Sequence, residues 1–475
     1  MSVKTNKKTK KIIDFLQKEW VLIMILLVLA SATRFLYLGH PKEMVFDEVY
    51  FAKWVTNYYN GQFYFDIHPP LAKMMLAASA KIFGYGDAGN TDFSKIGNAY
   101  QTDYYKFLRG MEGLFGVILV LAVYALGKKM FKNKWPGFLA GLLIVFDNAI
   151  LVQSRFIFTD VFLLAFGVIG LYFIYRLKEH QRLNSDAFVD LFFAALFLAA
   201  SILIKWTALI FIGVGIVVLF IDVLQNKKKD FVFFIKEATA IAGIILVVYL
   251  GIFAAHLMSL PYSGGQDDNF LSPRFQSTLL GNVNYGKYET PNLFERIVNL
   301  NVTMFAANAS ITKSHPYESK WYTWPIMWRS IFDWEKRLDN GQVERIYLLG
   351  NPLIWWMGLL SVVFVFITLF SKFRSKKKTI YFESLLVLAI GYLFNLLPYI
   401  FISRPAFLYH YFPSFIFMSL MMGFVLWFFL KEKPIVLIVI FIIIATSFVY
   451  FAPISYGLPM SEERFNDRMW LASWR

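Results

Sequence analysis

The chain carries the stretch Phe46-Asp47-Glu48-Val49-Tyr50, and then Asp66-Ile67-His68-Pro69-Pro70-Leu71-Ala72-Lys73, directly after its first long apolar segment. Two adjacent carboxylates and a His-Pro-Pro turn therefore lie where the chain leaves a predicted membrane span. At the edge of a bilayer, a carboxylate pair is a candidate catalytic group or metal ligand. This stretch indicates where the chemistry lies, and the apolar segments around it determine the fold.

Composition places the chain among membrane proteins. Of its 475 residues, 58% are hydrophobic and 19% are aromatic, which is more than a soluble protein of this size could bury. Apolar runs of about 18 residues or more predict membrane-spanning helices. The predicted fold class is an all-α polytopic membrane protein of about eleven spans, of which the third and fifth are short for a full crossing. The predicted spans are 20–38, 107–127, 135–151, 160–176, 189–205, 206–223, 237–258, 350–371, 381–402, 411–430 and 435–451.

The net charge of +15 does not indicate a nucleic-acid partner, because the basic residues cluster in short segments between the spans. Such clustering is typical of cytoplasmic loops, and it also favours contact with anionic membrane lipid. If the segments alternate between inside and outside, every dense cluster falls inside, and the C-terminus falls outside. The inside segments are Lys4–Lys18, Lys128–Lys134, Arg176–Arg182, Lys227–Lys236, Lys372–Lys378 and Lys431–Lys433.

The predicted spans divide the chain into five parts. The N-terminal part is basic and has no small-residue cleavage site, so we interpret it as a cytoplasmic tail before an uncleaved span. The chain contains no cysteine, which excludes disulfides, thiolate catalysis and cysteine-ligated metals. The parts are the tail 1–19, a transmembrane module 20–258 that includes the first outside loop 39–106, a large outside loop 259–349, C-terminal spans 350–451 and an outside tail 452–475.

The first outside loop has helical periodicity. Its aromatic residues Phe46, Tyr50, Trp54 and Tyr58 recur every four positions, which predicts one stripe of a helix lying in the membrane interface. Asp47 and Glu48 lie at the start of that helix, where the helix dipole tolerates negative charge. A second interfacial helix is predicted over 71–82.

Two readings are open for each polar motif of this loop. Asp47 and Glu48 are either a solvated helix start or a general base that accepts a proton from an incoming hydroxyl. His68, which precedes two prolines, belongs either to a rigid turn or to a wall of the site with its imidazole pointing inward.

Several cationic or potentially cationic residues lie at the predicted outer face, against the trend of the loop charges. Any one of them could be an arginine or lysine snorkelling to the interface, but together they suggest a bound anion, most naturally a phosphate. They are Arg34, Arg109, Lys205, Arg404 and His410.

A polar interruption separates the third and fourth predicted spans and contains Gln153, Arg155 and Asp160. It is either an ordinary turn or a part of the substrate site. No Walker loop, GxGxxG or HExxH motif is present, so nucleotide hydrolysis, dinucleotide binding and zinc proteolysis lack support. A lipid-linked phosphosugar fits the remaining features, with its tail in the bilayer, its phosphate among the cations and its sugar near Asp47.

The same motifs resemble the protein O-mannosyltransferase family of the GT-C superfamily, and the chain looks like a bacterial member. Both quoted stretches of the first loop carry the resemblance, and further matches follow in the same order along the chain. These are Gln153-Ser154-Arg155, Lys205-Trp206-Thr207, His315-Pro316-Tyr317 with 321–324, Phe407-Leu408-Tyr409-His410-Tyr411, and Met469-Trp470-Leu471 to Trp474. The loop 259–349 is too short and too poor in strand pattern for the β-trefoil domain of the eukaryotic members.

The resemblance implies transfer of mannose, with inversion, from a polyprenyl-phosphate carrier to Ser or Thr of secreted or membrane proteins at the outer face of the plasma membrane. Asp47 would correspond to the base and Glu48 to its essential partner. Arg34 and Arg109 match functionally sensitive arginines, and Lys205, Arg404 and His410 would lie near the carrier phosphate. No cofactor is implied, a divalent metal stays open, and the secretion translocon is a candidate partner.

Two other functions share these features. One is a GT-C enzyme that transfers a lipid-linked sugar to a lipid or a cell-wall glycan. The other is a transporter for a lipid-linked sugar, which would favour charged residues near span centres. The spans here are apolar through their middles, which favours an enzyme.

Overall fold

The computed structural model describes residues 17–85, 88–226, 228–373 and 380–475. Within these ranges, nine helical segments are long and apolar enough to cross a membrane. They are α5 Tyr104–Phe131, α8 Asp160–Leu177, α9 Ser185–Ile202, η1 Trp206–Ala208 with α10 Leu209–Gln225, α11 Phe231–Ser259, α14 Pro352–Phe373, α15 Phe382–Leu396 with η4 Leu397–Ile400, η5 Leu408–Tyr411 with α16 Phe412–Leu430, and α17 Pro434–Tyr456.

The first and third predicted spans are shorter helices. Helix α2, Glu19–Phe35, has 17 residues, and α6, Lys134–Val145, has 12. The third span is short because the chain breaks at Asp147, whose carboxylate caps the separate helix α7, Asn148–Gln153, by accepting the Ile150 N–H at 2.9 Å. The expectation of a short fifth span is wrong, because α9 runs for 18 residues.

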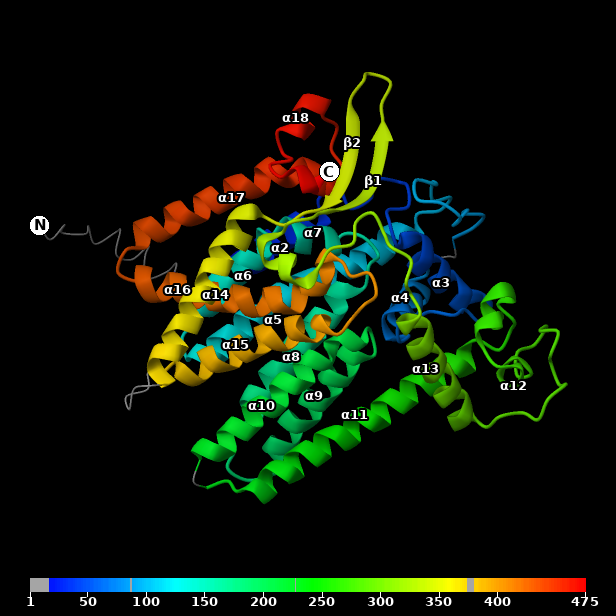
Figure 1. Cartoon of the computed structure of the whole chain (residues 1–475), viewed down its shortest axis with the longest axis horizontal. Coiled ribbons are helices and arrows are strands. Elements are labelled where there is room, and N and C mark those ends of the chain that lie inside the picture. Colours follow the sequence, from blue (N-terminus) through cyan, green and yellow to red (C-terminus); the bar gives the residue numbers. More distant parts are fainter. Residues whose placement is uncertain (1–16, 86–87, 227, 374–379) are drawn as a thin grey trace, which may run out of the picture.

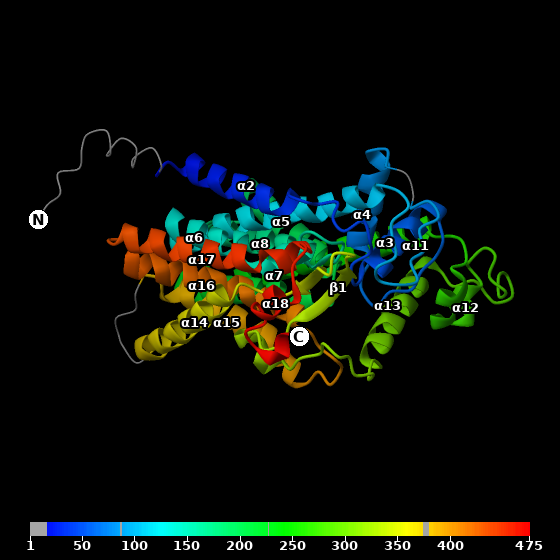
Figure 2. The same ribbon diagram turned by 90° about the horizontal axis from the view of Figure 1, so that it is seen from above.

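The core of the bundle is built on α5, which packs against α2, α6 and α8, while α16 packs against α6 (Figure 2). Glycines permit the closest of these approaches. A Cβ added at Gly127 of α5 would lie 2.7 Å from the Cα of Gly137 of α6, so any larger residue would force the two helices apart.

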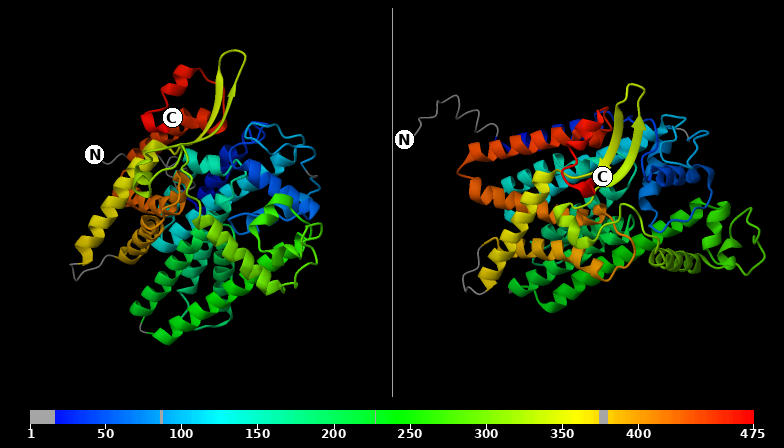
Figure 3. Two further views of the ribbon diagram at one scale, coloured as in Figure 1. Left: turned by 45° about the vertical axis from the view of Figure 1, so that its right-hand side comes forward. Right: turned by 45° about the horizontal axis from the view of Figure 1, so that its top comes forward.

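The connecting segments gather at two opposite ends of the bundle (Figures 1 and 3). The α16–α17 turn, with Lys431 and Lys433, and the α10–α11 connection lie at one end. The helices of the first loop, the whole of the 259–349 segment and the C-terminus lie at the other, which we call the loop end. The predicted basic tail lies outside the described residues up to position 16, as does most of the Lys372–Lys378 cluster.

The first loop forms the two predicted helices, α3 Glu48–Asn60 and α4 Leu71–Ile82. The aromatic stripe of α3 packs partly inside the protein. Trp54 stacks on Tyr64 with ring centroids 5.3 Å apart, and the Tyr58 hydroxyl lies 2.7 Å from Nδ1 of His256 on α11. The stripe therefore serves packing within the protein as well as any contact with the membrane interface.

The 259–349 segment adds a feature that the all-α prediction did not include. After η2 Gly265–Phe270, α12 Pro273–Gln276, α13 Leu293–Ala309 and η3 Trp321–Ile326, it forms an antiparallel hairpin of β1 Ile331–Arg337 and β2 Val343–Leu348. The pairing register shifts between Phe332 and Trp334, so Asp333 is the extra residue of a β-bulge. An Asn340-Gly341 pair in the hairpin loop is the sequence signal for this turn.

The C-terminal tail, with α18 Glu462–Asn466 and η6 Ala472–Trp474, contacts the hairpin from its base at Ser330 to Val343, next to its turn. The indole of Trp474 is fully buried and donates to the Met327 carbonyl at 2.6 Å. The Val343 N–H donates to the Met460 carbonyl at 2.9 Å. The tail thus holds the hairpin over the loop end of the bundle.

Candidate active site

A polar cavity of about 260 Å³ opens at the loop end, where segments from all parts of the chain meet. The start of α3, the His-Pro-Pro turn, the start of α8, the residue before η1 and the 404–413 segment each contribute to its wall. The predicted site residues that line it are Asp47, His68, Asp160, Lys205, Arg404 and His410.

Asp47 is held in this cavity by its own loop. The preceding residue, Phe46, has a positive φ of 44°, and its N–H donates to the Asp333 carbonyl on β1 at 3.1 Å. Within the described residues, the Asp47 carboxylate accepts no hydrogen bond and forms no ion pair. Burial, with the nearby Asp160 and Asp66 carboxylates adding to it and Lys205 opposing it, raises the pKa of Asp47 to about 6. A free carboxylate with a pKa near neutrality suits a general base.

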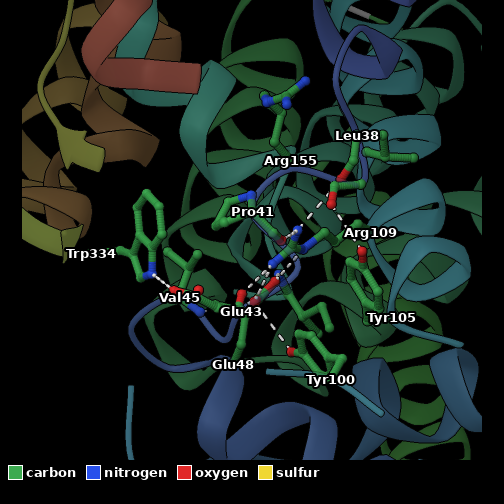
Figure 4. A network of polar contacts seen from close by, with 12 residues as sticks. Leu38, Pro41, Glu43, Val45, Glu48, Tyr100, Tyr105, Arg109, Arg155 and Trp334 are labelled. Atoms are coloured by element: carbon green, nitrogen blue, oxygen red, sulfur yellow. Dashed lines mark hydrogen bonds and ion pairs between the residues drawn. The ribbon is translucent and has the colours of Figure 1, made fainter. Parts of the chain in front are cut away.

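Glu48, the next residue, points the other way into a closed network (Figure 4). Its carboxylate forms a bidentate ion pair with Arg109, in which Nε donates at 2.8 Å and Nη2 donates at 2.7 Å. The N–H groups of Val45 and Ile157 and the Tyr100 hydroxyl also donate to it, at 3.0, 3.1 and 3.2 Å. Both partners of the pair are fully buried, so Glu48 has no free oxygen for a proton transfer.

The predicted phosphate-binding arginines of the first half are not brought to the cavity. Arg109 is occupied by Glu48 and by the Pro41 and Glu43 carbonyls, at 2.7 and 3.0 Å. Arg34 is fully buried and donates to the Ile144 and Val145 carbonyls at the end of α6, at 2.8 and 3.1 Å. A guanidinium bound in this way satisfies the free carbonyls of a helix end.

Arg155 and Gln153 also lie away from the cavity wall. Arg155 is fully buried and donates to the carbonyls of Arg34 and Tyr37, at 3.0 and 2.9 Å, so it caps the end of α2. Gln153 ends α7, and its buried Oε1 has no hydrogen-bond partner within the described residues. Of the polar interruption, only Asp160 reaches the cavity.

Lys205 is the cation closest to Asp160. Its Nζ lies 2.9 Å from both Asp160 oxygens and 5.4 Å from the centre of the Tyr409 ring. The ion pair fixes the ammonium in the wall that the polar cavity shares with its neighbour. His68 also lies in this shared wall, and burial, followed by the charges of Lys205 and Lys73, lowers its pKa well below the usual value. It is therefore a neutral group at physiological pH.

Arg404 and His410 form a second cationic corner. Nη2 of Arg404 lies 3.5 Å from Nε2 of His410. Nδ1 of His410 lies 3.0 Å from the Phe407 N–H donor. Nδ1 also lies 3.1 Å from the Phe407 carbonyl oxygen, so in one tautomer Nδ1 donates to this oxygen and Nε2 accepts from Arg404. In the tautomer in which Nδ1 accepts the Phe407 N–H, Nε2 carries the ring proton, and two donors face each other. An anionic oxygen between them would satisfy both.

A larger apolar cavity of about 680 Å³ adjoins the polar one. The two share four residues of their walls, His68, Lys205, Thr207 and Arg404. The rest of the wall of the larger cavity includes Leu209 and Ile210 of α10, Phe305 of α13, Phe394 of α15, and Phe401 and Ile402 of the segment that follows η4. The apolar cavity, the cationic wall and the free carboxylate of Asp47 thus lie next to one another in space.

Two carboxylic acids near the site were missed in the sequence. Glu112 of α5 is fully buried and accepts the Thr159 N–H at 3.1 Å, next to Asp160; an acid inside an apolar span was the available signal. Asp333 is buried in the β-bulge, and its Oδ2 has no hydrogen-bond partner within the described residues. Burial, followed by the charge of Asp47, raises the pKa of Asp333 well above its usual value.

No metal site accompanies these groups in the part of the chain that the structure describes. There, no three His, Asp or Glu side chains are arranged to hold a metal ion.

Comparison with solved structures identifies the fold as that of the GT-C membrane glycosyltransferases. The structure matches a chain of the Saccharomyces cerevisiae protein O-mannosyltransferase Pmt1-Pmt2 complex bound to the sugar donor, with a TM-score of 0.87, 18% identity and coverage of 96% of this chain and 92% of that one. It also matches ArnT from Cupriavidus metallidurans bound to undecaprenyl phosphate, with a TM-score of 0.52, 14% identity and coverage of 91% and 70%.

The chain belongs to the protein O-mannosyltransferase family. The family model described as dolichyl-phosphate-mannose-protein mannosyltransferase matches residues 24–261, and that of the C-terminal four TMM region of protein-O-mannosyltransferase matches residues 293–474. Protein O-mannosyltransferase 1 of Drosophila melanogaster is 31% identical over 266 residues, which are 54% of this chain and 30% of that protein. Dolichyl-phosphate-mannose--protein mannosyltransferase 4 of Schizosaccharomyces pombe is 28% identical over 370 residues, 75% of this chain and 45% of that protein. The matched region thus covers less than half the length of either relative.

Proposed function

We propose that this protein transfers mannose from a polyprenyl-phosphate carrier to the hydroxyl group of Ser or Thr in a polypeptide. One observation carries the proposal: the free carboxylate of Asp47 faces the same cavity as Lys205, Arg404 and His410. A base and an anion-binding wall are thereby held on two sides of a space that a sugar could fill. Family membership supports mannose as the sugar and a protein as the acceptor.

The reaction needs one proton acceptor and one charge-neutralising wall. The Ser or Thr oxygen attacks C1 of the mannose, the bond between C1 and the phosphate oxygen breaks, and the hydroxyl proton passes to the Asp47 carboxylate. Attack opposite to the leaving phosphate inverts the anomeric carbon. The departing phosphate gains charge that Lys205, Arg404 and His410 can stabilise, so the leaving group needs no general acid.

The apolar cavity is the proposed site of the carrier lipid. Its volume of about 680 Å³ and its phenylalanine and isoleucine side chains suit an isoprenoid chain. Because Lys205 and Arg404 belong to both cavities, a lipid phosphate would be bound where the two cavities join. Its sugar would then extend toward Asp47.

In this proposal the other predicted site residues act by holding neighbouring groups in place. Arg34, Arg109 and Arg155 hold the carbonyls that shape the loop, and Glu48 holds Arg109. Asp160 orients Lys205, while Gln153 is a packing residue. Of these residues only Asp160 lines the cavity, and the others would act without touching either substrate.

The site is proposed to face the outside of the plasma membrane, because the basic turns lie at the opposite end of the bundle. The absence of native cysteine makes labelling of single introduced cysteines clean. An impermeant maleimide should react in intact cells with Asn60→Cys, Glu289→Cys and Glu463→Cys, but not with Lys132→Cys, Lys228→Cys or Glu432→Cys, all at exposed positions. The reverse pattern would place the site inside.

The transfer itself is tested with purified protein, polyprenyl-phosphate-mannose and a Ser/Thr-rich peptide, read by mass spectrometry. The expected result is a peptide heavier by one hexose, formed only when the carrier is present. Consumption of the carrier with an unmodified peptide would indicate a lipid or glycan acceptor. Movement of an intact carrier across a vesicle membrane would indicate a transporter. Crosslinking in cells would test secreted proteins and the secretion translocon as partners.

A further inference from the structure

Residues 310–315 connect α13 to the segment before η3 and form one wall of the catalytic cavity. The side chains of Ile311, Lys313 and His315 line the cavity that contains Asp47. Those of Thr312 and Ser314 line instead an adjoining polar cavity of about 170 Å³, which shares Arg404 and Pro405 with the first. Alternation with a period of two is the geometry of an extended chain, so this wall is a strand-like segment with a different cavity on each face.

This strand-like segment has no strand partner. Within the described residues, the backbone groups of Ile311, Thr312, Lys313 and Ser314 make no hydrogen bond. The last three of these residues are exposed, so the segment is accessible from solvent. By contrast, β1 and β2, which belong to the same 259–349 segment (the outer segment), pair with each other along their length. An unpaired extended backbone presents a row of alternating donors and acceptors to whatever comes beside it.

We propose that residues 311–314 are a docking edge on which the acceptor polypeptide adds as an extended strand beside the catalytic cavity. The proposal rests on the proposed function and names how that function recognises its acceptor. A row of alternating N–H and C=O groups complements another peptide backbone, and neither a lipid nor a glycan offers that pattern. The recognised partner is therefore an unfolded or extended segment of a protein.

Backbone pairing would also explain how the acceptor is placed without reading its sequence. Main-chain hydrogen bonds contribute affinity that does not depend on the side chains. In an extended strand every second side chain points to the same face, about 6.6 Å apart. One Ser or Thr at a time would thus face Asp47, while its neighbours point away from the base.

The first test removes single backbone donors by Thr312→Pro and Lys313→Pro, each compared with the alanine variant at the same position. Because N–H groups alternate between the two edges of a strand, one of the two proline variants should raise the KM for the peptide about tenfold over its alanine counterpart, the factor for the loss of about 1.4 kcal/mol. Donor affinity, measured on the same samples, should be equal for the proline and the alanine variant at each position, which shows that both are folded. Equal KM values for proline and alanine variants at both positions would overturn the proposal.

The second test uses disulfide crosslinking, since the chain has no cysteine of its own. Thr312→Cys is paired with acceptor peptides that carry one cysteine at successive positions, and Glu289→Cys, at an exposed site on the outer segment, is the control. The yield should alternate between odd and even peptide positions for Thr312→Cys only. A yield without alternation would overturn the docking edge. Crosslinking needs no transfer, so a peptide that docks with alternation but receives no mannose would refute the proposed function alone.

Discussion

Asp47 and Glu48 are adjacent in the chain, yet they belong to two regions of opposite character. Around Glu48 every carboxylate oxygen is bonded, to Arg109, to two backbone N–H groups and to a tyrosine hydroxyl. Around Asp47 the carboxylate is free and faces cations across an open cavity. The start of α3 separates the two side chains, and the closed region holds the loop from which the open region projects.

The closed region should produce the largest effect when it is broken. Arg109→Leu leaves the Glu48 carboxylate buried without its counter-ion, and such a loss typically costs about 3–5 kcal/mol of stability. We expect a strong fall in thermal stability and in the yield of folded protein. The control is Lys336→Ala, which breaks the partly exposed ion pair with Glu43 and should cost no more than about 1 kcal/mol. Native-like melting of Arg109→Leu would contradict a stabilising function for this network.

The open region should show the reverse pattern, with activity lost and stability kept. Asp47→Asn retains the shape of the side chain but cannot accept a proton, so transfer should fall by a factor of about 100 or more. Melting should stay close to that of the native protein. The matched control is Asp103→Asn, a carboxylate that is 65% exposed at the start of α5. Near-native turnover of Asp47→Asn would exclude it as the base.

The spans and both helices of the first loop were predictable because each depends on a local pattern. An apolar run needs only its own residues to leave water. Of the four predicted stripe aromatics, Tyr50, Trp54 and Tyr58 lie within α3, whereas Phe46 precedes the helix with a positive φ. The break at Asp147 was only partly predictable in this way, because the cap that Asp147 provides to the Ile150 N–H is local but its other contacts are not. Its carboxylate is bonded by Trp355 at 2.8 Å and by the Asn351 N–H at 3.0 Å, and both partners are more than 200 residues away along the chain.

The five cations that the sequence grouped together also separate according to contacts that are not local. The sequence grouped Arg34 and Arg109 with Lys205, Arg404 and His410, because all five lie at one face of the bundle. Whether a buried cation meets a carbonyl or an anionic ligand depends on which helix ends lie next to it, and Arg34 meets Ile144 across 110 positions of the chain. Charge alone therefore grouped the five residues, whereas tertiary packing brings only Lys205, Arg404 and His410 to the cavity.

Replacement of Arg404 tests the open region by its effect on donor affinity. Arg404→Ala should weaken binding of the polyprenyl-phosphate donor by roughly 10- to 100-fold, as expected for one charge-assisted hydrogen bond. Arg404→Lys should lose less, because it keeps the charge and loses the fork, and His410→Ala should also lose less than Arg404→Ala. Arg274→Ala, at a half-exposed arginine on the outer segment, is the control. Unchanged donor affinity in Arg404→Ala and His410→Ala would assign the phosphate to Lys205 alone.

The pH dependence of transfer should report the environment of Asp47. The carboxylate must be ionised to act as a base, and its pKa is raised from 3.8 to about 6. Activity should therefore be full above about pH 7 and should fall about tenfold per unit below about pH 6. The measurement is kcat/KM for the peptide at saturating donor, with melting followed across the same range. If the activity instead fell only near the ordinary pKa of an aspartate, water would reach the Asp47 carboxylate freely.

The smallest effect is expected at Asp333, the buried carboxyl group of the β-bulge. Burial and the charge of Asp47 raise the pKa of Asp333, which favours its neutral form beside an ionised Asp47, so we expect a neutral amide of the same shape to replace it closely. Asp333→Asn should leave the acid limb of the pH profile within about 0.3 unit of its native position. If Asp333 were instead ionised beside Asp47, its replacement would remove a negative charge and shift that limb to lower pH. An unmoved limb therefore means that the hairpin gives Asp47 a neutral neighbour, and a limb moved to lower pH means that it gives a charged one.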